Sequence, residues 1–301
     1  MRKYIISDLH GNGEVYDSVM AYLDNISKNE EVELYINGDL IDRGLHSLRM
    51  LNDVIARCNG KGKIKVHYLG GNHELLMYQA YLDYLKWGYI NYYGLWIYNG
   101  GWILEKDLDK LGYEKAIDYY KYMGNLEIYK KFDEKIDGKN ILLVHSMPPK
   151  KVYDNCHLKI SDNSIEVEDC LWKREKTSDL WGYNNLGKEG YLVIRGHSPL
   201  KDKPFLYNKK QNWLNIDGGC SCYSLGMFYV DHVPLVEIKK DYLQILVFNH
   251  NNQIIDGYNF NGKFQKMNKK ELDNSRLNIN HKYDNVAINE KRLIKEYRNL
   301  I

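Results

Sequence analysis

One pattern occurs three times in the first 90 residues: a short apolar run, a polar loop that contains glycine, and a helix with one apolar face. The predicted strands are 3–7, 33–37 and 65–70. The predicted helices are 14–27, 48–58 and 74–86. Each unit has about 30 residues, the length of a strand–helix–strand crossover. The repeat therefore predicts parallel strands whose polar loops meet at their carboxyl ends, where α/β proteins place active sites.

The rest of the chain has a less regular pattern. Residues 87–139 are expected to be mostly helical, 150–190 loop-like, and 288–300 a last helix. Further apolar runs predict strands, and those that follow one another without a helix are expected to form antiparallel hairpins. These runs are 140–145, 191–197, 212–217, 227–238 and 242–249. Because no linker is visible, we assign 1–249 to one catalytic domain and treat 250–301 as a C-terminal extension of unknown role, packed on the same domain.

Composition restricts the class of protein only weakly. A chain of 301 residues can bury a core without disulfides or a structural metal. Its 42 Lys and Arg against 40 Asp and Glu give a net charge of +2, so we expect no nucleic-acid partner. The five cysteines lack zinc-ribbon spacing and are expected to be reduced thiols in a cytoplasmic protein. The amino-terminal apolar run is too short for a signal peptide, and no run approaches the ~20 apolar residues of a membrane span.

Groups that bind metals follow the predicted strands. The three early loops are Asp8-Leu9-His10-Gly11, Gly38-Asp39-Leu40-Ile41-Asp42-Arg43-Gly44 and Gly70-Gly71-Asn72-His73-Glu74. Two later strands each end in a histidine. The candidate ligands are Asp8, His10, Asp39, Asn72, His145 and His197. This mixture of carboxylate, amide oxygen and imidazole suits Mn, Fe or Zn better than calcium or a thiolate-bound metal.

Each of these residues also has an ordinary structural interpretation. Asp8, Asp39 and Asn72 are residue types that favour helix N-caps and turns. A single histidine at the end of a strand, such as His145 or His197, is commonly a core residue. Six such residues at five strand ends, in this order, are better explained by one metal site.

The ordered motifs DLHG, GDLIDRG and GNHE, followed by a strand-end histidine and RGH, resemble the phosphoprotein phosphatase family of metallophosphoesterases. The resemblance covers roughly 3–245 and is closer to the bacterial and phage, lambda-phosphatase-like branch. Supporting segments are Trp96 with Asn99-Gly100-Gly101-Trp102, Leu171-Trp172-Lys173-Arg174-Glu175 and Asn215-Ile216-Asp217-Gly218-Gly219. It implies an α/β, calcineurin-like metallophosphoesterase fold: central mixed β-sheets in a β-sandwich, flanked by helices, with the metal site at the carboxyl ends of strands.

The resemblance also implies a dinuclear site. Asp8, His10 and Asp39 would bind the first of two divalent metal ions. Asp39 would bridge to the second, which Asn72, His145 and His197 would complete. Manganese is the expected metal, with iron or zinc as alternatives. A hydroxide between the metals would attack phosphorus directly, without a phosphoenzyme.

Four further residues acquire roles from the resemblance. Arg43 and Arg174 would hold the phosphate oxygens, His73 would protonate the leaving oxygen, and Asp42 would orient His73. The aromatic residues of 87–102 are expected to form core or a groove wall rather than specific contacts. Two departures from the family pattern are Ser7 before the first loop, where glycine is common, and Ser146-Met147-Pro148-Pro149 after the first strand-end histidine.

Three functions are compatible with the motifs. The favoured one is a serine/threonine protein phosphatase that acts on phosphorylated proteins or peptides, and on small phosphoesters in vitro. A symmetrical diadenosine tetraphosphatase, or another nucleotide phosphohydrolase, shares the same motifs. The third is a catalytically inactive binding module, against which the complete set of ligand residues argues.

Overall fold

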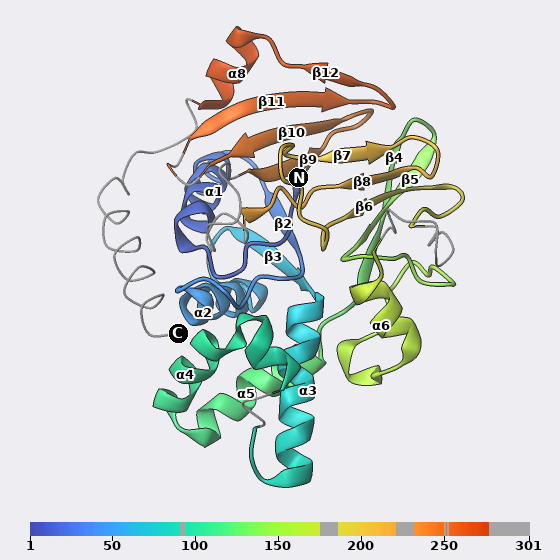
Figure 1. Ribbon diagram of the computed structural model, residues 1–301. Helices are drawn as coiled ribbons and strands as arrows, with labels where there is room; N and C mark the ends of the chain where they lie inside the picture. Colours follow the sequence, from blue (N-terminus) through green and yellow to red (C-terminus); the bar gives the residue numbers. More distant parts are fainter. Residues whose placement is uncertain (91–93, 175–185, 221–231, 250, 252, 277–301) are drawn as a thin grey trace.

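Two β-sheets form the centre of the molecule, with helices outside them (Figure 1). The computed structural model describes residues 1–90, 94–174, 186–220, 232–249, 251 and 253–276. An apolar core between the sheets includes Ile5 and Tyr35 from one sheet and Ile141 and Ile194 from the other. This arrangement confirms the predicted mixed-sheet, calcineurin-like architecture.

Sheet A has seven strands in the order β12-β11-β10-β9-β1-β2-β3. Their bounds are β1 Arg2–Ile6, β2 Val32–Asn37, β3 Ile64–Leu69, β9 Val233–Ile238, β10 Leu243–Phe248, β11 Ile254–Phe260 and β12 Phe264–Lys266. Strands β1, β2 and β3 run parallel, as predicted. The helices that follow them are α1 Gly13–Ile26, α2 Ser47–Cys58 and α3 Asn72–Trp87. The three early loops therefore lie together at one edge of sheet A.

Sheet B has five strands in the order β4-β5-β6-β8-β7. Their bounds are β4 Tyr129–Ile136, β5 Lys139–Val144, β6 Tyr191–Arg195, β7 Leu206–Asn208 and β8 Trp213–Asn215. Strands β5, β6 and β8 are parallel, and β4 and β7 pair antiparallel at the edges. The expectation of antiparallel hairpins is therefore wrong for β6 and β8. The chain between them returns along β7, so β8 starts at the same end as β6. The expectation holds for β9 with β10.

Two segments differ from the predicted secondary structure. Strand β4 lies in the stretch that was expected to be helical. Its buried residues Tyr129, Phe132 and Ile136 have helix-like spacing because a register shift interrupts the pairing with β5 between Lys131 and Lys135. Helix α6, Ile165–Trp172, lies in the stretch expected to be loop-like, preceded by a short 3₁₀ turn at Ile160–Asp162. Ser164 caps α6 by accepting a hydrogen bond from the Val167 amide at 3.3 Å.

A helical lobe extends from α3 at the lower part of Figure 1 and contains α4 Trp102–Leu111 and α5 Tyr113–Gly124. Beyond residue 249, β11 pairs with β10, and α8 Lys269–Arg276 follows β12. The weak sequence pattern after 250 indicated none of these elements. The helix expected at 288–300 lies outside the described residues. Within the described chain, no helix has the length and apolar character needed to span a membrane.

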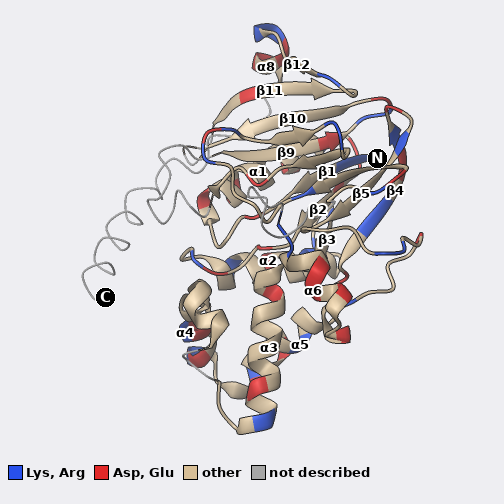
Figure 2. Cartoon of the chain, turned by 45° about the vertical axis from the view of Figure 1, so that its right-hand side comes forward, with Lys and Arg blue, Asp and Glu red and all other residues tan. Residues whose placement is uncertain are grey.

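In Figure 2, charged residues of both signs are scattered over the helical lobe and the two sheets. That distribution agrees with the small net charge of the sequence. Asp8, Asp39 and Asp42, in contrast, are buried in the loops at the carboxyl ends of β1 and β2. Buried carboxylates of this kind need cations or hydrogen-bond donors around them.

Candidate metal and phosphoester site

The predicted site residues are concentrated in strained backbone. Of nine non-glycine residues with positive φ in the described chain, six belong to the predicted site. These six are Asp8, His10, Asp39, Asp42, Arg43 and His197. A left-handed conformation costs an ordinary residue about 1–3 kcal/mol and persists only where the surroundings hold it, typically at functional sites.

Backbone hydrogen bonds between the loops after β1 and β2 provide part of this support. The His10 amide donates to Asp39 O at 2.8 Å, and the Gly11 amide donates to Leu40 O at 2.7 Å. In return, the Gly44 amide donates to His10 O at 3.0 Å. The two loops therefore form one unit, in which the side chains of His10 and Asp39 must converge.

Glu74 provides the rest of the support, and our sequence reasoning assigned it no role. Its buried carboxylate accepts hydrogen bonds from the amides of Asp39 (2.8 Å), Leu40 (3.0 Å) and Gly71 (2.8 Å), and from the Tyr68 hydroxyl (2.6 Å). Burial and the nearby Asp39 carboxylate raise the pKa of Glu74. The available signal was its place in the first turn after Gly71, from which an acidic side chain can bond back to the helix start.

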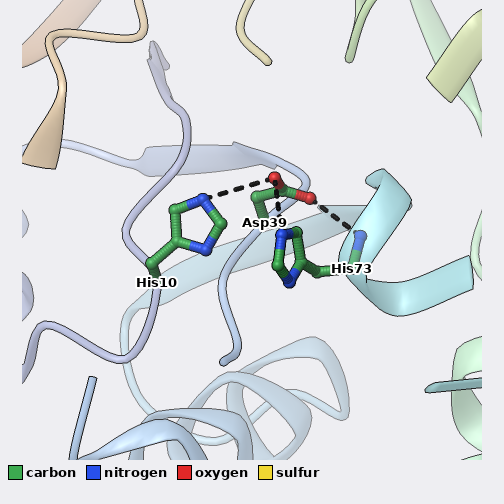
Figure 3. Close-up of side chains that lie close together, drawn as sticks. All are labelled: His10, Asp39 and His73. Carbon is green, nitrogen blue, oxygen red and sulfur yellow. Dashed lines mark hydrogen bonds and ion pairs between the residues drawn. The ribbon is translucent and has the colours of Figure 1, made fainter. Parts of the chain in front are cut away.

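Asp39 lies between two groups of ligand-type side chains. One group is His10, Asp39 and His73, and the other is Asp39, His145 and His197; within each group one ligand atom per residue lies within 4.8 Å of the others. Figure 3 shows the first group, in which Asp39 Oδ2 lies 3.3 Å from His10 Nε2 and 4.0 Å from His73 Nε2. Asp39 Oδ1 lies 3.4 Å from His145 Nε2. Only Asp39 belongs to both groups.

The donor set fits divalent cations, as shown by the histidine tautomers. His145 Nδ1 lies 2.9 Å from Asn37 O, and because a carbonyl oxygen only accepts, Nδ1 must carry the proton. When His145 loses its second proton, the lone pair of Nε2 points toward the oxygens of Asp39. His10 repeats the arrangement, with Nδ1 3.2 Å from Ile41 O and Nε2 facing Asp39. Imidazoles fixed by a backbone carbonyl, with the other nitrogen facing a carboxylate, are typical of metal-binding histidines.

Asn72 completes the second group. Its Oδ1 lies 3.0 Å from His145 Nε2 and 2.8 Å from His197 Nδ1. His197 Nε2 lies 3.0 Å from Trp172 O at the end of α6. The structure thus brings Asn72 from α3 together with the histidines that follow β5 and β6.

Asp8 is buried at the centre but belongs to neither group. Its Oδ1 accepts a hydrogen bond from the His197 amide at 3.0 Å, and its Oδ2 accepts one from the Ser7 hydroxyl at 2.5 Å. Ser7, a departure from the family pattern, thus has a contact in the site. Burial raises the pKa of Asp8 to about 6, with His145 lowering it and Asp39 raising it.

The electrostatics of the second group are dominated by burial and by one ion pair. Burial alone would lower the pKa of His145, but attraction to Asp39 raises it to about 9. Conversely, His145 and His73 hold the pKa of Asp39 well below its usual value despite burial. Burial and the charge of His145 lower the pKa of His197 to about 2. A cation that binds here would therefore displace a proton from His145.

His73 is linked to a second carboxylate, Asp42. His73 Nδ1 lies 2.7 Å from Asp42 Oδ2, and His73 Nε2 lies 2.9 Å from Arg43 Nη2. Burial raises the pKa of Asp42, partly offset by the hydrogen bond with His73. Trp96 donates its indole N–H to Asp42 at 2.9 Å and 3.1 Å from the two oxygens. The expectation that the aromatic residues of 87–102 make no specific contact is therefore wrong for Trp96.

Two more polar residues adjoin the second group. Arg174, just after α6, is exposed and places Nε 3.1 Å from His197 Nε2. Asp217 is buried, and burial together with the Asp8 carboxylate raises its pKa well above the usual value. Its Oδ1 accepts a hydrogen bond from the Gly219 amide at 3.0 Å. The motif that contains Asp217 was visible in the sequence, but nothing in its spacing indicated proximity to Asp8.

Comparison with known proteins agrees with this architecture. A serine/threonine protein phosphatase from Saccharomyces cerevisiae aligns with a TM-score of 0.53 at 14% identity, covering 83% of this chain and 80% of that protein. A mutant of a cold-active protein tyrosine phosphatase aligns with a TM-score of 0.50 at 14% identity, covering 89% and 80%. At this identity the likeness concerns the fold alone. No curated protein matches the chain in sequence. The sequence profile of the calcineurin-like phosphoesterases matches residues 1–233, and the chain belongs to this family of metallophosphoesterases.

Proposed function

We propose that the chain is a metal-dependent phosphomonoester hydrolase that acts as a serine/threonine protein phosphatase. The observation that carries the proposal is the position of Asp39, shared by two groups of ligand-type side chains, beside the Asp42–His73 pair and Arg43. This combination offers cation binding, proton transfer and phosphate binding within one buried cluster.

The cation-binding residues are divided between the two groups. Asp8, His10 and Asp39 would hold one divalent cation, and Asp39, Asn72, His145 and His197 the other. When bound, the cations would neutralise phosphate charge and lower the pKa of a water, which makes it a nucleophile at neutral pH. Since the set contains no thiolate, manganese is the expected metal, with iron or zinc as alternatives.

The remaining residues act on the phosphoryl group and its leaving oxygen. Arg43 and Arg174 would bind phosphate oxygens, because a guanidinium matches their geometry and charge. Arg43 Nη2 donates to His73 Nε2 in this structure, so His73 would donate a proton from Nε2 to the leaving oxygen once Arg43 turns to the phosphate. We assign His73 this role rather than that of a ligand because its Nε2 lies 4.0 Å from Asp39 Oδ2, against 3.3 Å for His10. Asp42 accepts a hydrogen bond from Nδ1 of His73 and thereby orients the imidazole ring.

Two segments support a protein substrate over a nucleotide. The motifs at 96–102 and 171–175 carry the resemblance to the protein phosphatase branch. The first contacts Asp42 and Arg43, and the second brings Trp172 and Arg174 against His197. The described residues of both segments therefore lie beside the candidate site.

A side-by-side assay tests the proposal. Purified protein with added Mn²⁺ should hydrolyse phosphoserine and phosphothreonine peptides faster than diadenosine tetraphosphate, compared by kcat/KM. Chelation should abolish turnover, and Mn²⁺ should restore it. A preference for diadenosine tetraphosphate would replace the protein substrate by a nucleotide. Full activity of metal-stripped protein would contradict the metal-dependent mechanism itself.

A further inference from the structure

The segment Trp96-Ile97-Tyr98-Asn99-Gly100-Gly101, called here the 96–101 segment, belongs to neither sheet. It precedes α4 and includes a distorted turn with Gly100 at φ 101°. It nevertheless contacts the catalytic loop after β2 at three points: the Asp42 carboxylate, the Arg43 amide and the Arg43 guanidinium.

Those contacts reach two consecutive left-handed residues. Asp42 and Arg43 have φ values of 71° and 66°. The Arg43 amide donates to Gly100 O at 3.1 Å, and Arg43 Nε donates to Asn99 O at 3.4 Å. Since such backbone persists only under external support, the 96–101 segment is part of what maintains this turn.

The contact of Trp96 also orients a carboxylate. Asp42 is completely buried and has two side-chain donors, His73 Nδ1 and Trp96 Nε1. A carboxylate with one donor can rotate about its own bond. The second donor, bridging both oxygens from another direction, holds Oδ2 toward His73.

Gly100 has a separate effect on Arg43. A side chain at Gly100 would place its Cβ 2.8 Å from Arg43 Cγ and 3.1 Å from Arg43 N. The backbone of Gly100 therefore packs directly on the stem of Arg43. This packing and the bond from Arg43 Nε to Asn99 O set the direction in which the guanidinium extends.

We propose that the 96–101 segment is a positioning element for both the proton donor and the phosphate-binding arginine. Trp96 orients Asp42 toward His73, while Asn99 and Gly100 orient Arg43. The inference rests on the proposed phosphoester hydrolysis and assigns these roles to residues that touch neither substrate nor metal.

The role proposed for Trp96 predicts an effect of mutation that depends on the leaving group of the substrate. Trp96→Phe keeps an aromatic ring but removes the N–H donor. With a phosphoserine peptide, kcat should fall about 10- to 100-fold, a part of the ~10²–10⁴-fold that general acid catalysis contributes. With p-nitrophenyl phosphate, whose leaving group needs no proton, kcat should change little. KM should stay near that of the wild type for both substrates.

The role proposed for Gly100 predicts a different pattern of kinetic changes. Gly100→Ala should displace Arg43 and raise KM about tenfold for both substrates alike, because a binding contact common to them is weakened. The ratio of the two kcat values should stay unchanged. The two variants therefore separate the proton-donor function of the segment from its phosphate function.

Each variant has a matched control. Trp213→Phe also removes a buried indole donor, which bonds Gln211 Oε1 at 2.9 Å in sheet B. Gly112→Ala also places alanine at positive φ, here 82°, but with no atom within 4 Å of the new Cβ. Both controls should lose comparable stability in thermal unfolding and keep wild-type kcat and KM.

A spectroscopic measurement tests the contact without turnover. The indole N–H resonance of Trp96, identified in the metal-free protein by its absence in Trp96→Phe, should shift in Asp42→Asn, while that of Trp213 should not. Equal slowing of both substrates by Trp96→Phe, or an unmoved Trp96 resonance, would overturn the inference. If the wild type hydrolyses no phosphoester, the proposed function fails, and the resonance alone then decides whether Trp96 positions Asp42.

Discussion

Sheet A and sheet B contribute different parts of the candidate site. The segments that follow the strands of sheet A contain the groups proposed for proton transfer, His73 and Asp42, together with Arg43, proposed to bind phosphate. The strand ends of sheet B contribute His145 and His197, which face the shared Asp39. In the proposed mechanism, chemistry on the leaving group thus belongs to one sheet, whereas cation binding would require both.

The parts of the candidate site that come from sheet A and from sheet B also differ in the contacts that hold their residues in place. The loops after β1 and β2 bond to each other, and Glu74 in the first turn of α3, which follows β3, accepts a hydrogen bond from the Asp39 amide. The sheet B histidines depend on sheet A: Asn37 O in β2 accepts from His145, and the Asp8 carboxylate accepts from the His197 amide. A change in sheet A should therefore damage both groups, and a change in sheet B only one.

Asp39→Asn should have the largest effect on the site, because Asp39 is shared by both groups of ligand-type side chains. Asn is nearly isosteric with Asp and tolerates left-handed backbone, so the fold should survive. The loss of the shared charge should weaken cation binding by both groups and reduce kcat by more than the ~10²–10⁴-fold expected for a lost general acid. Metal content by elemental analysis and kcat with Mn²⁺ measure the two effects.

Asp137→Asn is the matched control, because Asp137 also has positive φ, at 51°, but lies in the turn between β4 and β5. It should keep normal metal content and kcat. If Asp39→Asn behaved in the same way, Asp39 would not be the shared ligand.

His73→Asn should separate chemistry from cation binding within sheet A. Phosphoserine-peptide hydrolysis should slow by ~10²–10⁴-fold, because an alkoxide leaving group needs a proton, and p-nitrophenyl phosphate hydrolysis should slow much less. Asp42→Asn should follow the same pattern in milder form. Metal content must be measured in each variant, since Asn72 adjoins His73. Equal slowing of both substrates with metals retained would assign His73 to phosphate positioning instead.

The β1–β3 part of sheet A could be predicted from the sequence because its order is local. Each strand, loop and helix is continuous, so the repeat indicates parallel strands and brings Asp8, Asp39 and Asn72 to one edge. Glu74 and Trp96 were not assigned roles, because their partners depend on loop geometry. Asp42 is 54 residues from Trp96 in the sequence, and no periodic pattern links them.

Sheet B was less predictable because its features depend on contacts between residues that are distant in the sequence. The register shift in β4 gives a strand the apolar spacing of a helix, and β7 separates two parallel strands that look like a hairpin series. The order of motifs predicted His145 and His197 as ligands, but their orientations depend on Asn37 O and Trp172 O from distant elements.

Arg43 and Arg174 allow the proposed phosphate binding to be compared between the loop that follows β2 and the segment that follows α6. Arg43 is held by Asn99 and Gly100, whereas Arg174 is exposed and has its described contact with His197. Arg43→Ala should reduce kcat/KM about 10²-fold, the lower end for one preorganised donor, and Arg174→Ala less. The double variant should show less than the summed loss, because both residues are proposed to bind one phosphoryl group. An unchanged kcat/KM for Arg174→Ala would exclude that arginine from the site.

The smallest expected effect concerns stability. The ion pair between His145 and Asp39, which links the two sheets, should make the stability of the protein depend on pH. The pKa of His145 in the metal-free protein is raised from 6.5 to about 9 by Asp39, against the effect of burial. Since the folded-state pKa is raised, this stabilisation, about 3 kcal/mol at most, is fully present below pH 6.5 and is lost as the pH rises through 9. The Tm of the metal-free protein should therefore fall by several degrees across this window.

Added Mn²⁺ should have the opposite dependence, because the cation needs neutral His145 and competes with its proton. The increase in Tm on adding Mn²⁺ should thus grow from pH 6.5 to 9, measured by calorimetry at several pH values. His145→Asn should flatten both trends, while His157→Asn, outside the site, should leave them unchanged. If the metal-free wild type and His145→Asn lose Tm equally over this range, the His145–Asp39 pair does not stabilise the fold. The dependence of sheet B on sheet A would then rest on the other contacts between them, such as the bond from the His197 amide to the Asp8 carboxylate.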